Sequence, residues 1–111
     1  MLKNVYDKTN PQNNKSEIFE DLYINGNIKI ERIISTGQKT NDGEWLSEIE
    51  SEWVMLLQGN AGLVFDSGEK YDLKKGDYLL IPSYKKHRVE YTSEIPPCIW
   101  LAIHINSKLT Q

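Results

Sequence analysis

The chain has 111 residues, of which 39% are hydrophobic and 26% are charged, a balance typical of one globular domain. Its 13 basic and 16 acidic side chains give a formal net charge of -3 and are well mixed, which argues against a nucleic-acid-binding surface. A single cysteine, Cys98, excludes an intrachain disulfide and a cysteine-only zinc cage. No apolar run approaches the length that spans a bilayer, so we expect no membrane association and a cytoplasmic location.

Residues 1–22 are expected to form an arm ahead of the main domain. The first 16 residues are polar and rich in Asn and Lys. Ser16 can then cap one short helical turn, in which Ile18, Phe19 and Leu22 would share an apolar edge. The expected organisation is therefore an arm with a short helix at 1–22, a barrel at 23–106 and a C-terminal tail at 107–111.

From residue 28 onward the pattern changes to short strands separated by turns. Residues 28–33 alternate with the period of two that is typical of a half-buried strand. Further strands are expected at 53–58, 63–65, 71–73, 78–81, 88–92 and 99–105, with glycine-containing turns between them. Many short strands at this close spacing predict an all-β sandwich or barrel.

Two of these strands are apolar on both faces. In the first, Val54 and Leu56 lie opposite Trp53 and Met55, and the strand 99–105 shows the same feature. A barrel strand normally presents a polar face to water, so both strands need a cover on their outer side. The cover is either the N-terminal segment or a second subunit, and we expect a homodimer through this sheet.

Five residues in the middle of the chain carry the most specific pattern. Glu52 is followed seven residues later by Gly59, and Gly76 is followed by Pro82 and then by His87. This layout places one carboxylate and one imidazole on separate strands that can face a common interior. Such a pair on rigid strands can bind a metal ion or a polar ligand.

The pattern resembles the two motifs of the cupin superfamily, in particular its small single-domain members (cupin 2 type). Glu52 and Gly59 match the Glu and Gly of the first motif, and Gly76, Pro82 and His87 match the second. The second motif has another Gly where this chain has Tyr84, and an Asn where it has Tyr91. The resemblance covers residues 28–105 and implies a cupin-type double-stranded β-helix, or jelly-roll, barrel.

The two His residues of the first motif are absent, since their places fall within residues 45–48. Cupin metal sites use several His with the Glu to bind Fe, Mn, Ni or Zn. The resemblance therefore implies a degenerate site, in which Glu52 and His87 are the matched ligands for a divalent metal. A third ligand would come from Glu48 or from His104 on the last strand.

Two functions follow from the resemblance. In the first, the barrel binds a small molecule, and the residues expected to bind it are Trp45, Glu52, Val54, Tyr84, His87, Val89 and Tyr91. The alternative is a metal-dependent enzyme of the dioxygenase, isomerase or decarboxylase type that uses Glu52 and His87. A metal-free Glu/His acid–base pair and a regulatory role through a separate partner are also open. The sequence identifies neither the ligand nor a catalytic residue.

Overall fold

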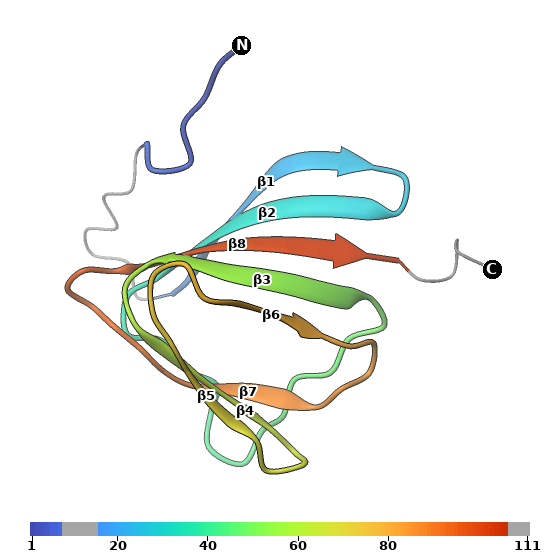
Figure 1. Ribbon diagram of the computed structural model, residues 1–111, viewed down its shortest axis with the longest axis vertical. Coiled ribbons are helices and arrows are strands. Elements are labelled where there is room, and N and C mark those ends of the chain that lie inside the picture. The colour runs from blue at the N-terminus through green and yellow to red at the C-terminus, as the bar shows by residue number, and fades with distance from the viewer. Residues whose placement is uncertain (8–15, 107–111) are drawn as a thin grey trace.

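Eight β-strands make up the regular structure of residues 1–7 and 16–106, the parts of the chain that the computed structural model describes. In chain order they are β1 (Ile18–Asn25), β2 (Ile28–Ser35), β3 (Ser51–Gln58), β4 (Ala61–Phe65), β5 (Lys70–Leu73), β6 (Tyr78–Ile81), β7 (His87–Thr92) and β8 (Cys98–Ile105). They form two antiparallel sheets, with strand orders β1-β2-β8-β3-β6 and β5-β4-β7 (Figure 1). Within the described ranges, no helix has the length and apolar character needed to cross a membrane.

The short helical turn expected over residues 17–22 is wrong, because residues 18–22 lie in β1 and Glu17 directly precedes it. This strand pairs with β2 from Ile18 opposite Ile34 to Asn25 opposite Ile28. A single helical turn is costly to nucleate, whereas a strand in this position gains a full ladder of hydrogen bonds with β2. The sheet therefore begins inside the segment expected to precede the barrel. Residues 8–15 of the expected arm and the expected tail at 107–111 lie outside the described residues.

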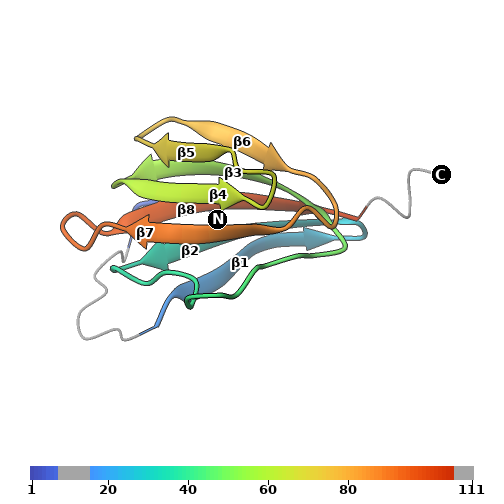
Figure 2. The same ribbon diagram turned by 90° about the horizontal axis from the view of Figure 1, so that it is seen from below.

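The strands expected between residues 28 and 105 are confirmed, with ends that shift by no more than two residues. Side chains alternate along each strand, so every second residue points into the space between the two sheets. Figure 1 shows the five-stranded sheet above β4, β5 and β7, and Figure 2 shows the same strands from below. The buried core between the sheets consists of Val54, Leu56, Ala61, Leu63, Phe65, Leu73, Ile81, Cys98, Trp100 and Ala102.

The outer face of the five-stranded sheet is also apolar. Trp53 on β3 is paired with Ile103 on one side and with Leu80 on the other, and Ile30 continues this row on β2. Leu80 is 51% exposed, whereas Trp53 and Ile103 are half-buried. The second apolar face expected for β3 and β8 is therefore present and is only partly covered.

Arg32 fastens the N-terminal segment to this outer face. Its guanidinium is buried and donates through Nη1 to the carbonyl oxygens of Val5 (2.8 Å) and Asp7 (2.6 Å). The Nε of Arg32 donates to Glu20 on β1 at 2.9 Å. The Tyr6 hydroxyl donates to the carbonyl oxygen of Leu57 at 3.4 Å. One charged side chain on β2 thus holds both β1 and residues 5–7 in place.

We expect replacement of Arg32 by Ala to lower the free energy of unfolding by about 2 kcal/mol, because several hydrogen bonds to a charged donor are lost together. Urea unfolding measures this change. Trypsin cleavage after Lys3 should also become faster as residues 5–7 come free. Arg32→Lys keeps the charge without the planar donor group and should fall between the two proteins. An unchanged unfolding midpoint in Arg32→Ala would contradict this role.

Candidate functional site

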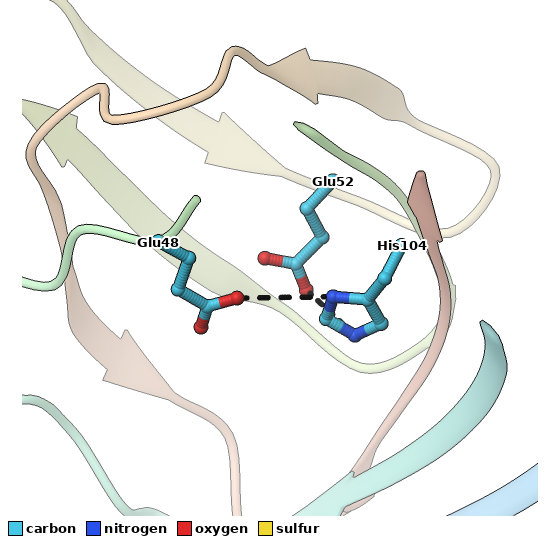
Figure 3. Close-up of side chains that lie close together, drawn as sticks. All are labelled: Glu48, Glu52 and His104. Carbon is cyan, nitrogen blue, oxygen red and sulfur yellow. Dashed lines mark ion pairs between the residues drawn. The ribbon is translucent and has the colours of Figure 1, made fainter. Parts of the chain in front are cut away.

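Three side chains of the types that can ligate a metal meet at one end of the space between the sheets (Figure 3). Glu52 and His104 lie directly opposite each other on β3 and β8, so their side chains point to the same face. Glu48, from the loop before β3, points toward the same imidazole. One ligand atom from each residue lies within 4.8 Å of the others, and no second group of three such side chains occurs among the described residues.

The imidazole of His104 has a carboxylate near each nitrogen. Its Nε2 lies 3.0 Å from Oε1 of Glu31 and 3.8 Å from Oε2 of Glu52, whereas Nδ1 lies 3.8 Å from Oε2 of Glu48. An ionised carboxylate can only accept a hydrogen bond, so the Nε2–H of His104 donates to Glu31. In the neutral imidazole the lone pair is then on Nδ1, the nitrogen that faces Glu48.

Glu31 is the residue that orients His104. It lies on β2, and its side chain is only 8% exposed. Lys29 partly offsets this buried charge, since its Nζ lies 3.6 Å from Oε2 of Glu31 and 3.9 Å from Oδ1 of Asp21. A carboxylate that accepts from the far nitrogen of a metal-binding His fixes the ring and its tautomer. The contacts from Lys29 to Glu31 and from Glu31 to His104 therefore resemble those that hold the ring of a metal-binding His in place.

Burial raises the pKa of Glu52 to about 7. The side chain is 13% exposed, and the carboxylates of Glu48 and Glu31 raise its pKa further. His104 and Lys29 act in the opposite direction. A substantial fraction of Glu52 therefore holds a proton at neutral pH, which is the protonation balance expected of a group that exchanges protons or binds a cation.

Glu48 belongs to a loop but is held by hydrogen bonds to another loop. The amide of Tyr84 donates to the carbonyl oxygen of Glu48 at 2.7 Å. The Ser47 hydroxyl donates to the carbonyl oxygen of Tyr84 at 3.1 Å, and the Ser83 hydroxyl donates to that of Ile49. The Glu48 side chain is 47% exposed, so it forms the open side of the group.

Tyr84 adopts a backbone conformation that favours glycine, with φ at 63°. A non-glycine residue in this region is disfavoured by roughly 1–2 kcal/mol. The motif described above has glycine at this position, and the positive φ supplies the physical reason. This conformation also directs the Tyr84 amide to Glu48, while 65% of the residue's surface stays exposed to solvent.

His87 is not a member of the close ligand group of Glu48, Glu52 and His104. His87 is buried at the start of β7, and its Nδ1 lies 3.0 Å from the carbonyl oxygen of Lys85. Its ring is perpendicular to that of Phe65, with the centroids 6.5 Å apart. Glu52 thus meets the imidazole of His104 in the one close ligand group of the described residues. A ligand role for His87 stays a prediction.

The other residues expected to bind a ligand lie in different surroundings. Val54 is part of the buried core, and Val89 packs against it. Trp45 is 42% exposed, and the guanidinium of Arg88 lies over its ring at 5.7 Å from the centroid. These contacts give Trp45 and the two valines structural roles, and their binding of a ligand stays a prediction.

Tyr91 lies opposite Gly62 in the three-stranded sheet. A Cβ at Gly62 would come within 2.4 Å of the Tyr91 ring, so the glycine makes room for the ring to lie across the strand. The Tyr91 hydroxyl donates to Oδ1 of Asp72 at 2.7 Å, and this bond raises the pKa of Tyr91 to about 12. Neither Gly62 nor Asp72 belongs to the group around His104.

The sequence analysis missed Glu31 and Lys29. The alternation of the strand indicated where both residues point. Lys29 and Glu31 lie on the same face as Ile33, and Ile33 packs against the core. A charged pair on the core-facing side of a strand needs a buried partner. The identity of that partner, His104, depends on the pairing of β2 with β8, which residues 28–33 do not specify.

Comparison with known families gives one match over most of the chain, because residues 35–104 match the model of the cupin domain. A crystal structure from Ralstonia eutropha JMP134, of a candidate mannose-6-phosphate isomerase, is 34% identical to this chain. Its TM-score is 0.90, and the alignment covers 96% of this chain and 98% of that one. No curated protein matches the sequence.

Two more distant structures share the fold. A cupin superfamily protein from Desulfitobacterium hafniense has a TM-score of 0.69 at 21% identity, with 82% of this chain and 78% of that chain covered. The polyketide cyclase RemF from Streptomyces resistomycificus has a TM-score of 0.68 at 18% identity, with 83% and 66% covered. At these identities the likeness concerns the fold alone.

The raised pKa of Glu52 predicts a specific pH dependence of stability. Glu52 ionises at about 7 in the folded protein and near 4.5 when unfolded, so unfolding releases a proton between these values. The free energy of unfolding should therefore fall by about 3 kcal/mol as the pH rises from 4.5 through 7, and level off above. Glu52→Gln should lack this fall and be the more stable protein at pH 8.

Urea unfolding from pH 5 to pH 8 in the presence of a chelator measures the difference between the two proteins. Glu90→Gln, which removes an exposed carboxylate from β7, is the matched control and should behave like the parent. Parallel pH profiles for the parent and Glu52→Gln would show that Glu52 ionises at an ordinary pH in the folded state.

Proposed function

The chain belongs to the cupin domain family, and on this basis we propose that it binds a small molecule at a site organised around a divalent cation held by Glu48, Glu52 and His104. The observation that carries the proposal is the convergence of these three side chains within 4.8 Å. They occupy one end of the space between the sheets, with two of them on rigid neighbouring strands. Rigid strands position ligands more precisely than loops do.

The donor set fits a divalent metal. Two carboxylates and one imidazole suit Mn²⁺, Fe²⁺ or Zn²⁺, and the excess of oxygen donors favours Mn²⁺ among them. Glu31 accepts a hydrogen bond from Nε2 of His104, which leaves Nδ1 as the nitrogen that can bind the ion. Three protein ligands leave coordination positions for water and for a substrate.

Each residue of the group has a distinct task in such a site. A bound ion would act as a Lewis acid toward an oxygen atom of the small molecule. Glu52 would bind the ion as an ionised carboxylate, while Glu31 keeps the His104 ring in place. Glu48 would bind the ion from the solvent-exposed side of the site. The name of the Ralstonia neighbour makes isomerisation the first reaction to test in this chain.

A metal-free function is the second candidate, and one observation favours it. Glu52 has a pKa of about 7 and lies 3.8 Å from the imidazole of His104. A carboxyl group that exchanges its proton near neutral pH, placed beside an imidazole, can move a proton between two positions of a bound molecule. The two candidates use the same residues and differ in whether an ion binds.

We also propose that the chain forms a homodimer through the outer face of the five-stranded sheet. Tyr78 and Leu80 on β6 are 63% and 51% exposed, and the ring of Tyr78 lies 5.3 Å from that of Trp53. Arg32 on this face is already paired with Glu20, which lies opposite it on β1. An apolar face without unpaired charge complements a second copy of itself.

The metal proposal predicts which variants lose the ion. Isothermal titration with Mn²⁺ and elemental analysis should show binding in the parent and at least a tenfold loss of affinity in His104→Ala and Glu52→Gln. Glu31→Gln should weaken binding by about 10- to 100-fold through the orientation of His104. His87→Ala, the matched control, should retain the ion. Loss in His87→Ala with retention in His104→Ala would reverse the assignment.

The dimer proposal predicts a solution mass of twice the 12.9 kDa chain, measured by size-exclusion chromatography with light scattering. Leu80→Glu should shift the protein to the monomer, since it places a charge in the proposed interface. Ile95→Glu makes the same change at an exposed loop position and should leave the mass unchanged. A monomer mass for the parent chain at micromolar concentration would contradict the proposal.

A further inference from the structure

A small cavity adjoins the metal-ligating group. Its volume is about 210 Å³, and it shares one residue with the group, because His104 forms part of its wall. Lys29, Glu50 and the amide-bearing Asn27 also line it, as does the apolar side chain of Ile24. Pockets for drug-sized ligands are usually about 300–1,000 Å³, so this cavity suits a more compact molecule.

The charges around this cavity are mainly negative. The carboxylate of Glu50 belongs to the cavity wall itself. Four more carboxylates lie 3.0–3.9 Å from the charged or ring nitrogens of the wall residues Lys29 and His104, namely those of Asp21, Glu31, Glu48 and Glu52. Among the described residues that line the cavity, Lys29 is the one lysine or arginine. It is already engaged, at 3.6 Å from Glu31 and 3.9 Å from Asp21. A divalent cation would cancel only two of these negative charges.

From this charge balance we propose that the site takes a compact neutral molecule with several hydroxyl or carbonyl oxygens, and that it discriminates against phosphorylated forms of that molecule. The inference rests on the proposed function, because the ligand lies beside the ion held by Glu48, Glu52 and His104. It goes beyond that function by naming the charge class of the substrate. It also separates this chain from the phosphate ester in the name of its Ralstonia neighbour.

The physical reason is the repulsion between a phosphate dianion and the surrounding carboxylates. Two like charges 4 Å apart repel by about 1 kcal/mol in water and by about 4 kcal/mol at the effective dielectric constant of a protein surface. Lys29 already has two carboxylates beside it, so its single positive charge offsets only part of this repulsion. Hydroxyl groups instead donate to carboxylates, so the same residues favour a polyol.

The cavity wall supplies what such a ligand needs. Asn27 and Glu50 offer polar groups, and Ile24 offers an apolar surface for the C–H faces of a sugar. The neighbouring ion would take an oxygen of the ligand as one of its remaining ligands. A compact polyol can therefore form hydrogen bonds to the polar side chains, contact the apolar surface and bind the ion.

The test compares D-ribose with D-ribose 5-phosphate as probes, using the Mn²⁺-loaded protein and isothermal titration. We expect ribose to bind and its phosphate to bind at least tenfold more weakly. Glu50→Lys should narrow this gap, because it replaces a negative charge on the cavity wall by a positive one. Glu90→Lys makes the same change on the other sheet and serves as the matched control.

Tighter binding of the phosphate than of ribose, or binding of neither, would overturn the inference. Titration with Mn²⁺ alone separates this failure from that of the proposed function. If the ion binds but the charge preference is absent, only the inference fails. If no ion binds, the proposed metal site fails. Ribose and ribose 5-phosphate on the metal-free protein then still test the preference for the neutral sugar, which should be stronger because no cation offsets the carboxylates.

Discussion

The hydrogen bond between His104 and Glu31 is the interaction on which the candidate site depends. Both side chains are largely buried, with exposures of 11% and 8%, and a buried carboxylate requires a partner. His104 is the group that stands between Glu31, Glu52 and Glu48. Without it, the carboxylates would face one another in a poorly solvated space, and the cost of burying them would rise. The same bond fixes which nitrogen of His104 faces the opening.

That interaction depends in turn on the register of β8 between β2 and β3. The register pairs Val54 with Ala102 in the core and Glu52 with His104 one step along the same face. A slip of one residue would turn Ala102 and His104 outward and direct Ile103 into the space between the sheets. One strand register therefore specifies both the packing of the core and the assembly of the site. A change of register would disrupt the two together.

This dependence on strand register explains which parts of the fold and the site could be predicted from the sequence. The strands follow from local alternation, and Glu52 follows from its place in a motif, so both could be predicted. Glu48 and His104 could be named only as alternatives for a third ligand, and Glu31 was missed. Their meeting is set by the pairing of β2, β8 and β3 and by loop contacts, which no local pattern encodes. His87 was predicted as a ligand because it matches the motif, and His104, which matches no motif position, was named only as one of two further possibilities. β1 was missed because three apolar residues in five fit one helical turn as well as an irregular strand.

The two sides of the site are held by different forces. The closed side rests on the paired strands and the core. On the open side, Glu48 is held by backbone hydrogen bonds to the segment at Tyr84, which keeps a left-handed conformation despite its side chain. A strained residue persists only where its surroundings fix it, and here those surroundings are the loop that carries Glu48. Changes in this pair of loops can therefore alter the opening and the position of Glu48 while His104, Glu52 and the core stay as they are.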